Sequence, residues 1–416
     1  LLFVTFTKKY SKKDDAFWKE MLRSYEFQLY HLITNLEYHW RFTNNHILNN
    51  ARCLYLCGSI LGIQYIKKIG REILLSQTDK MIKNGFLQED SSHYQMLLTR
   101  SYLEILYTAD ISKDVGMLKW LQPRVGQMLT VCNMLQSRFQ AKEYPLFGDI
   151  SPDVFPEWMC GWPFSRDLNQ ISKWQKLFRM RNIDISSLTE KKTLQSSMDF
   201  SISRWYCISK GKFELWVIAR VHASASHGHA DNGSIVMFHN GDPIFIDPGR
   251  CDYVNNPNSL FQVSQEAHHT PIVDGIPIDS NFNSFLRFSW FGSRFTIMEI
   301  MKDYIKYQIT SICKRLKLVR EISLRKEAVI IEDTFHIKTS RSKITYNHYW
   351  CTCEKIDLFS NKAVIKMEAK FFEFAVTISD MFRSQSYGEL KQYFQLGFSG
   401  KIKPKQKITS ELRLLE

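Results

Sequence analysis

The stretch His227-Gly-His-Ala-Asp-Asn-Gly-Ser234 stands directly before a strand-like run of apolar residues. Two further polar clusters follow it along the chain, Asp247-Pro-Gly249 and Glu266-Ala-His-His-Thr270. Because His227 and His229 are two residues apart, an extended strand would point both side chains to the same face. Imidazole and carboxylate groups are ligands that zinc binds in proteins. The three clusters therefore predict a metal site built around strands.

The segment between the first two clusters predicts a β-hairpin. Ile235–Phe238 and Pro243–Ile246 are apolar runs, and the Asn240-Gly241 pair between them is a strong signal for a two-residue turn. The return strand would bring Asp247 close to His229. A lone histidine in a strand, or a lone Asp-Pro-Gly turn, is more often structural than functional. The combination of these clusters is what favours a functional region.

The composition limits the class of protein. The chain has 416 residues, enough for two or three domains with cores of their own. Hydrophobic residues make up 44% and charged residues 23%, which is typical of a globular protein rather than a disordered one. The net charge of +13 favours an acidic partner: an anionic polysaccharide, a nucleic acid or an anionic membrane surface. No apolar run reaches the roughly eighteen residues of a spanning helix, so we expect no membrane span.

The cysteines and the start of the chain bear on the compartment. The nine cysteines show no paired CxxC spacing, so we expect free thiols rather than a disulfide framework or a zinc knuckle. The first residue is Leu rather than Met, and no export signal is visible, which indicates a fragment or a processed form. We expect a bacterial protein of the periplasm or the cytoplasm, and its oligomeric state stays open.

Helical periodicity comes first along the chain. From Phe17 to Gln140 large apolar residues recur every three or four positions, with expected breaks at Lys83–Gly85, Thr108–Asp110 and Gln122–Pro123. Successive antiparallel helical hairpins of this kind suit an incomplete α/α toroid, with a plain helical bundle as the alternative. We assign residues 1–140 to this helical domain.

Strand-like patterns occupy the second half. Residues 141–200 are rich in Pro and Trp and predict an ordered connector rather than a loose linker. From residue 201 onward, short apolar runs alternate with polar turns, as in an antiparallel β-sandwich. Residues 201–416 therefore form the predicted β domain. The fold class is α+β in separate domains, with helices first and strands second.

A second polar constellation lies in the helical part. Thr43-Asn-Asn-His-Ile-Leu-Asn-Asn50 has four asparagines where a helix should bury apolar residues. Asn45 and His46 are therefore candidate functional residues, although a helix start capped by Thr43 or Asn44 explains the same pattern. Farther on, Ser91 or Ser92 is a plausible N-cap, which would place Tyr94 in the first helical turn. The alternative for Tyr94 is an ordinary buried aromatic residue.

In this order the motifs resemble the heparinase II/III-like polysaccharide lyases. That family has a His-x-His-x-Asp segment, an Asp-Pro-Gly and an Ala-His-Asn-Thr segment in its β domain, and an Asn-His pair and a Glu-x-Ser-x-x-Tyr segment on its helical side. The stretch Phe147–Asp153 is similar to the family's connector in bacterial members linked to surface polysaccharides. The chain departs from the pattern at His269, where Asn is usual, and at Gln95, where His is common. The first departure leaves open whether His268 or His269 is a ligand.

The resemblance implies β-elimination on a uronic-acid-containing acidic polysaccharide. Asn45 and His46 would neutralise the substrate carboxylate. Tyr94 would act as the acid, and as the base too if both protons lie on one face of the sugar. His227 would be the base or its orienter.

The resemblance also implies a metal and a substrate cleft. His229, Asp247 and His268 would hold a zinc ion of structural role. Carboxylate contacts and sugar stacking would come from Trp40, Arg41, Arg250 and Tyr253.

Two other classes of function stay open. A metal-dependent glycan hydrolase would use the His/Asp cluster to activate water and would not need Asn45 or Tyr94. A non-catalytic glycan-binding or assembly protein of surface polysaccharide biosynthesis would keep the fold but not the catalytic set. A nucleic-acid partner is not expected, since the net charge alone supports it and no recognition motif is present.

Overall fold

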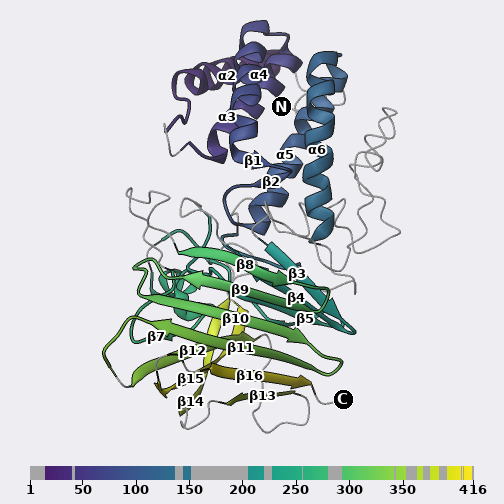
Figure 1. Ribbon diagram of the computed structural model, residues 1–416. Helices are drawn as coiled ribbons and strands as arrows, with labels where there is room; N and C mark the ends of the chain where they lie inside the picture. Colours follow the sequence, from purple (N-terminus) through teal and green to yellow (C-terminus); the bar gives the residue numbers. More distant parts are fainter. Residues whose placement is uncertain are drawn as a thin grey trace. The chain divides into compact units, whose positions relative to one another are not determined.

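Helices precede antiparallel sheets along the chain, as the sequence predicts (Figure 1). The computed structural model describes residues 15–39, 43–135, 144–150, 205–219, 227–254, 256–279, 293–341, 343–352, 363–368, 375–383, 391–403, 405 and 407–414. The chain divides into two compact units. The first comprises Leu1–Gly85 and Leu98–Gln127, and the second comprises Phe86–Leu97 and Met128–Glu416.

The first unit is helical. Its elements are α2 (Asp15–Thr34), α3 (Asn45–Leu61), α4 (Gln64–Met81), the short β1 (Ile82–Lys83) and the greater parts of α5 (Ser92–Ile111) and α6 (Val115–Met134). Helices α3 and α4 pack closely through Gly58 and Gly70, because a Cβ at either position would collide with the backbone of the other helix. None of the described helices combines the length and the apolar character needed to cross a membrane.

The helix boundaries confirm some sequence signals and correct others. The side chain of Asn44 caps α3, and positive φ angles at Asn84 and Gly85 form the expected turn after α4. The breaks expected at Thr108–Asp110 and at Gln122–Pro123 are wrong, because α5 runs through the first and α6 contains the second. In α5 the hydroxyl of Thr108 donates to a carbonyl of its own helix, so that polar residue does not end it.

The second unit is built on two antiparallel sheets. The order of the larger sheet is β14-β15-β12-β6-β5-β4-β3, with β7 paired to β12. Its strands are β3 (Trp205–Lys210), β4 (Phe213–Ile218), β5 (Ile235–His239), β6 (Asp242–Phe245), β7 (Ile272–Val273), β12 (Ile344–Thr352), β14 (Ala375–Arg383) and β15 (Lys391–Ile402). The β5–β6 hairpin turns at Asn240 and Gly241, both with positive φ, as the sequence predicts.

The smaller sheet has the order β13-β16-β11-β10-β9-β8. Its strands are β8 (Arg294–Ile300), β9 (Tyr304–Thr310), β10 (Leu316–Leu324), β11 (Ala328–Ile337), β13 (Ala363–Glu368) and β16 (Lys407–Leu414). The remaining described elements of the second unit are β2 (Phe86–Leu87), α10 (Pro257–Gln262) and a 3-10 turn η2 (Gln265–Ala267).

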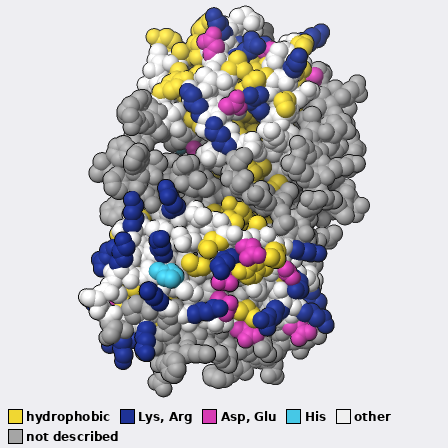
Figure 2. Space-filling model, viewed as in Figure 1, with side chains coloured by type: hydrophobic (Ala, Val, Ile, Leu, Met, Phe, Trp, Pro, Cys, Tyr) yellow, Lys and Arg dark blue, Asp and Glu magenta, His cyan; other side chains and the backbone are white. Residues whose placement is uncertain are grey.

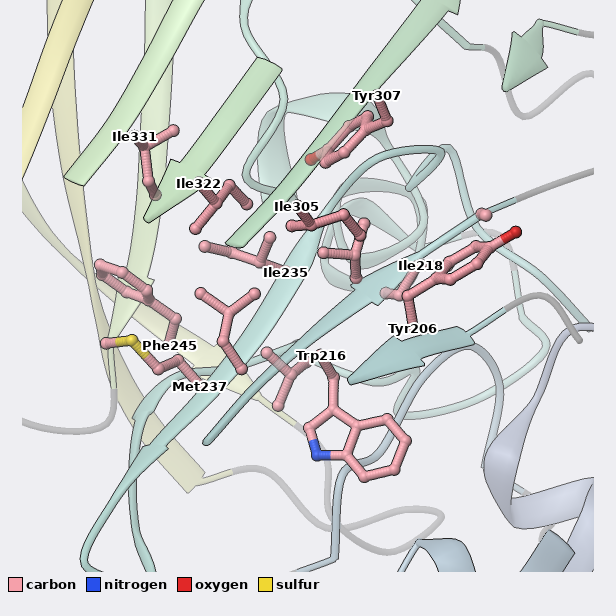
Figure 3. Packing of buried hydrophobic residues seen from close by; sticks show 14 of the residues in the cluster. Tyr206, Trp216, Ile218, Ile235, Met237, Phe245, Ile305, Tyr307, Ile322 and Ile331 are labelled. Carbon is pink, nitrogen blue, oxygen red and sulfur yellow. The ribbon is translucent and has the colours of Figure 1, made fainter. Parts of the chain in front are cut away.

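One hydrophobic core joins the buried faces of the two sheets. It gathers apolar side chains from the buried positions that alternate with less buried ones along the strands, as in β10 and β9. Members from both sheets are labelled in Figure 3: Trp216, Met237, Phe245, Ile305, Ile322 and Ile331. Burial of each such side chain stabilises the fold by about 1.5–3 kcal/mol.

Arg320 occupies an inward position of β10 between buried Leu318 and Ile322, and it is fully buried. Its guanidinium donates to both carboxylate oxygens of Asp333 on β11, at 2.7 and 2.8 Å. It also donates to the carbonyl of His269 at 2.6 Å. The charge is therefore satisfied by its partners, and the arginine fixes the loop that carries His269.

Replacing Arg320 by methionine is expected to lower the free energy of unfolding by about 3–5 kcal/mol, because Asp333 would stay buried without its partner. The double variant Arg320→Met/Asp333→Leu removes both charges and should recover part of this loss. Recovery stays incomplete because the carbonyl of His269 loses the charged donor that lies 2.6 Å from it. Urea denaturation of both variants and the wild type measures the difference. A single variant as stable as the wild type would contradict this role of the pair.

Candidate active site and metal centre

The predicted residues that meet in the structure all belong to the second unit. They come from the start of α5, the segment 227–234, the residues after β6 and the residues after η2. The spacing of His227 and His229 predicts that both lie on a strand. In the structure they lie instead in the irregular segment before β5. The two side chains come together because both contact Asp149, and not because side chains alternate along a strand.

Two tyrosines surround His227. The rings of Tyr94 and His227 are stacked, with centroids 3.6 Å apart and planes 13° from parallel. The hydroxyl of Tyr94 lies 2.9 Å from the hydroxyl of Tyr253, which lies 3.5 Å from Nδ1 of His227. Tyr94 is held at the start of α5 because Oγ of Ser91 accepts its backbone N–H, as the predicted N-cap requires. Phenol and imidazole groups thus form one cluster.

Asp149 is the residue that the sequence interpretation missed. Its carboxylate lies 3.1 Å from Nδ1 of His227 and 3.1 Å from Nε2 of His229, and its side chain is only 2% exposed. Although burial alone raises the pKa of Asp149, hydrogen bonds from the two histidines hold it well below its usual value. The acid lies within the stretch Phe147–Asp153, whose likeness to the family connector was the one available signal.

The ionised carboxylate of Asp149 fixes the tautomer of His227. A carboxylate only accepts hydrogen bonds, so Nδ1 of His227 carries the proton and donates it to Asp149. In the neutral ring Nε2 then has a free lone pair. In the described part of the chain this buried atom makes no hydrogen bond, and the carboxylate of Glu89 lies 3.7 Å away. Nε2 is therefore available as a proton acceptor.

Arg250 and Tyr253, predicted as substrate contacts, lie beside this cluster. The guanidinium of Arg250 is 3.7 Å from Asp149 and stands over the ring of Tyr253, 4.8 Å from its centroid. Burial, followed by the charge of Asp149 and the neighbouring Tyr94, raises the pKa of Tyr253 well above its ordinary value. Tyr253 therefore keeps its proton and can donate a hydrogen bond.

Gly148 allows Asp149 to approach the histidines. Its φ is +71°, and a Cβ there would lie 2.5 Å from the carbonyl oxygen of His227 and 2.6 Å from that of Asp90. The backbone N–H of Asp149 donates to the same His227 carbonyl at 2.7 Å. A residue with a side chain at position 148 would push the two segments apart.

His229, Asp247 and His268 form a fully buried group whose ligand atoms lie within 4.8 Å of one another. Nδ1 of His229 is 3.3 Å from Nε2 of His268, and these nitrogens are 3.6 and 3.5 Å from the two carboxylate oxygens of Asp247. A tetrahedral zinc site with bonds of about 2.0–2.1 Å has ligand atoms about 3.3–3.4 Å apart. The donor set and its spacing fit a metal ion.

The surrounding groups orient these ligands toward a common centre. Nδ1 of His268 donates to the carbonyl of Ser264 at 2.7 Å, and Nε2 of His229 donates to Asp149. The other nitrogen of each ring therefore directs its lone pair at the partner ring and at Asp247, an arrangement that only a proton or a metal ion stabilises. Burial lowers the pKa of His229, but the charges of Asp247 and Asp149 and the hydrogen bonds to them together outweigh it and raise the pKa to about 9. The centre thus favours a positive charge.

His269 lies apart from this ligand group. Its Nε2 accepts the backbone N–H of Cys351 at 3.0 Å, and its Nδ1 lies 3.2 Å from the hydroxyl of Ser234. Burial lowers its pKa to about 3, so the ring is neutral. Of the two adjacent histidines, the structure therefore places His268 in the group that could hold a metal ion and His269 in the core.

The other predicted residues lie elsewhere in the chain. Asn45 and His46 begin α3 in the first unit, where Nδ1 of His46 is 2.8 Å from the carboxylate of Glu37. Trp40 and Arg41 fall outside the described residues. The roles of these four residues stay predictions.

Comparison with known proteins finds one matching family and several similar solved structures. The family described as Heparinase II/III-like, C-terminal matches residues 192–380. No curated protein matches the sequence. Among solved structures, heparinase III has a TM-score of 0.74 at 15% identity, covering 98% of this chain and 67% of that one.

Two further solved structures are similar. A second heparinase III gene product has a TM-score of 0.71 at 16% identity, covering 96% of this chain and 63% of that one. Heparan sulfate lyase HepC from Pedobacter heparinus has a TM-score of 0.66 at 16% identity, covering 96% and 64%. At these identities the likeness concerns the fold, and this chain spans about two thirds of each relative's length. Residues 192–380 thus match the heparinase II/III-like C-terminal family, and the chain shares its fold with heparinase III.

Proposed function

We propose that this protein is a polysaccharide lyase that cleaves a uronic-acid-containing glycan by β-elimination. The observation that carries the proposal is the stacked pair of Tyr94 and His227, in which Asp149 fixes the tautomer of the histidine. A protonated phenol and an imidazole with a free lone pair, placed side by side, are the acid and the base that elimination requires.

The reaction needs two proton transfers and no water. Nε2 of His227 removes the proton at C5 of the uronic acid, and the electrons of that bond form the C4–C5 double bond. The bond from C4 to the glycosidic oxygen breaks, and the hydroxyl of Tyr94 protonates the departing oxygen. Tyr253, which holds its proton, supports the phenolate of Tyr94 by a hydrogen bond. Asn45 and His46 keep the role implied by the resemblance, neutralising the substrate carboxylate.

The metal of this proposal is zinc, with a structural role. His229, Asp247 and His268 would hold it, and it supplies a positive charge that fixes the segments before β5 and after β6 and η2. These segments carry His227 and Tyr253, so the ion preserves the geometry of the site without touching the sugar.

Removing the ion by a chelator is expected to lower the Tm, since binding to the folded state alone stabilises it by about 4 kcal/mol at a thousandfold excess over Kd. The variant His268→Ala should have a Tm that is lowered by the same amount before any chelator is added. The chelator should then lower its Tm no further. Elemental analysis and differential scanning calorimetry provide the two readouts. Protein that carries no metal after purification, and whose Tm does not respond to added zinc, would count against the centre.

The fold of the similar solved structures supports a more detailed description of the two units. We propose that the helical unit is part of an α/α toroid and that the two sheets form a β-sandwich, with the division into residues 1–140, 141–200 and 201–416 predicted from the sequence. The buried faces of both sheets share one core, which supports the sandwich.

A metal-dependent glycan hydrolase is the second candidate. It is favoured by the centre's three protein ligands, because catalytic zinc sites keep a fourth position for water. The experiment that separates the two is an assay of the wild type on a panel of uronic-acid polysaccharides. A lyase produces an unsaturated uronate that absorbs ultraviolet light together with each new reducing end. A hydrolase produces reducing ends without that absorbance, which would overturn the lyase proposal.

A further inference from the structure

One end of the smaller sheet's outward face is basic. Arg294 on β8 is paired in register with Thr310 on β9, Thr310 with Lys317 on β10, and Lys317 with His336 on β11. Residues directly opposite one another in a sheet point to the same face, so these four side chains form one row across four strands. Arg294, Lys317 and His336 are exposed, while their neighbours Leu316, Leu318 and Phe335 are buried.

Further cations extend this row. The exposed Lys314 and Arg315 lie in the β9–β10 turn, and the exposed Lys338 directly follows β11. The sequence has no Asp or Glu in residues 304–320 or in residues 334–353. We name Arg294, Lys314, Arg315, Lys317, His336 and Lys338 the basic row. Figure 2 shows Lys and Arg side chains gathered around a histidine on this face.

The other end of the same face is different, because its lysines are neutralised. Lys306 lies 3.0 Å from Glu321, and Lys407 lies 2.7 Å from Glu332. Near that end Lys210 lies 2.6 Å from Asp303. Among the described residues no member of the basic row has such a carboxylate partner. The positive charge is thus concentrated at one end of the sheet and creates a local positive potential.

We propose that the basic row is a second binding surface for the acidic polysaccharide, distinct from the Tyr94–His227 site. The inference rests on the proposed function, since a polymeric substrate extends beyond the bond that is cut. Neighbouring strands lie about 4.8 Å apart, so Lys317 and His336 are separated by about one such spacing and Arg294 and Lys317 by about two. A chain with carboxylates along its length can contact several of these cations at once.

The chemistry of the row favours a polyuronate over a nucleic acid. Its four paired positions hold Arg, Thr, Lys and His and offer no Trp, Tyr or Phe on which bases could stack. Point cations on a flat surface suit an extended chain of regularly spaced carboxylates.

The test measures binding of polygalacturonate, with neutral dextran as the comparison polymer, by isothermal titration calorimetry at low salt. All variants carry Tyr94→Phe, so that cleavage of the polymer during titration is slowed by about 10²–10⁴-fold. The triple variant Arg294→Ser/Lys317→Ser/Lys338→Ser should bind about tenfold more weakly, with a shallower dependence on salt. The control Lys210→Ser/Lys306→Ser/Lys407→Ser removes the same number of charges from paired lysines and should bind as the parent does.

Three results would overturn the proposal. Equal weakening in both triple variants would show that only net charge matters. Unchanged binding in the basic-row variant would show that the polymer contacts other residues. Duplex DNA that binds more tightly than polygalacturonate, and loses binding only in the basic-row variant, would make the surface a nucleic-acid site. The titrations measure binding and not cleavage, so they test the surface separately from the lyase function. If the wild type cut no polymer of the panel while binding still depended on the basic row, the lyase function would be refuted and the binding surface would stand.

Discussion

Replacing Tyr94 by phenylalanine is expected to reduce the rate of unsaturated uronate formation by about 10²–10⁴-fold, the usual contribution of a positioned acid or base. The variant keeps the ring that stacks on His227 at 3.6 Å, and it loses only the hydroxyl that protonates the leaving oxygen. Ultraviolet absorbance of the product on the best substrate of the panel measures the rate. The Tm should stay close to that of the wild type, because the buried ring is retained.

Tyr253→Phe is the matched control for Tyr94→Phe. It removes the hydroxyl that lies 2.9 Å from that of Tyr94, but it leaves the proposed acid in place. We expect a smaller loss, about tenfold, the value of one hydrogen bond. If the two variants were equally impaired, the acid could not be assigned to Tyr94. A Tyr94→Phe variant with wild-type rate would remove Tyr94 from the mechanism.

Replacing Asp149 by asparagine should lower kcat by about 10²–10⁴-fold with little change in KM. The amide oxygen can accept the hydrogen bond from the N–H at Nε2 of His229, and the amide NH₂ then faces Nδ1 of His227. Nδ1 must now accept, so the proton of the imidazole moves to Nε2, which can no longer act as the base. An amide in place of the carboxylate behind a histidine base costs about 10⁴-fold in a serine protease for this reason.

Comparison with Asp149→Ala separates this effect from a structural one. Alanine leaves the N–H of His229 without its acceptor, which should weaken metal binding by about 10–100-fold. Asparagine keeps that acceptor, so its metal content should match the wild type while its kcat falls. Equal loss of metal in both variants would mean that Asp149 acts only on the centre. Unchanged kcat in the asparagine variant would exclude its role in orienting His227.

Local patterns in the sequence predicted those parts of the site that depend on neighbouring residues. The Asn240-Gly241 turn forms the β5–β6 hairpin, and Asp247 lies 3.6 Å from His229 as expected from it. The N-cap of α5 at Ser91 is likewise local, because a side chain and an N–H three residues apart decide it. Alternation of apolar residues similarly predicted antiparallel strands, since period two reflects the pleat itself.

Contacts between distant segments could not be predicted in this way. Asp149 meets His227 and His229 only after the chain has folded, and nothing near Asp149 in the sequence marks its partners. His227 and His229 have strand spacing but lie in an irregular segment, because Asp149 rather than a ladder of hydrogen bonds determines where they point. Pro123 inside α6 shows the same limit, since buried Leu121 and Val125 on either side outweigh its preference for a helix end.

Arg320 has a consequence for engineering this protein. A search for more stable variants would favour apolar replacements of the Arg320–Asp333 pair, because a well-packed hydrophobic core is often more stable than a buried ion pair. The same guanidinium holds the carbonyl of His269, the residue next to His268. In this protein, however, the carbonyl of His269 would lose its charged donor, so such variants would stay below the stability of the wild type and would also lose the positioning of a candidate metal ligand.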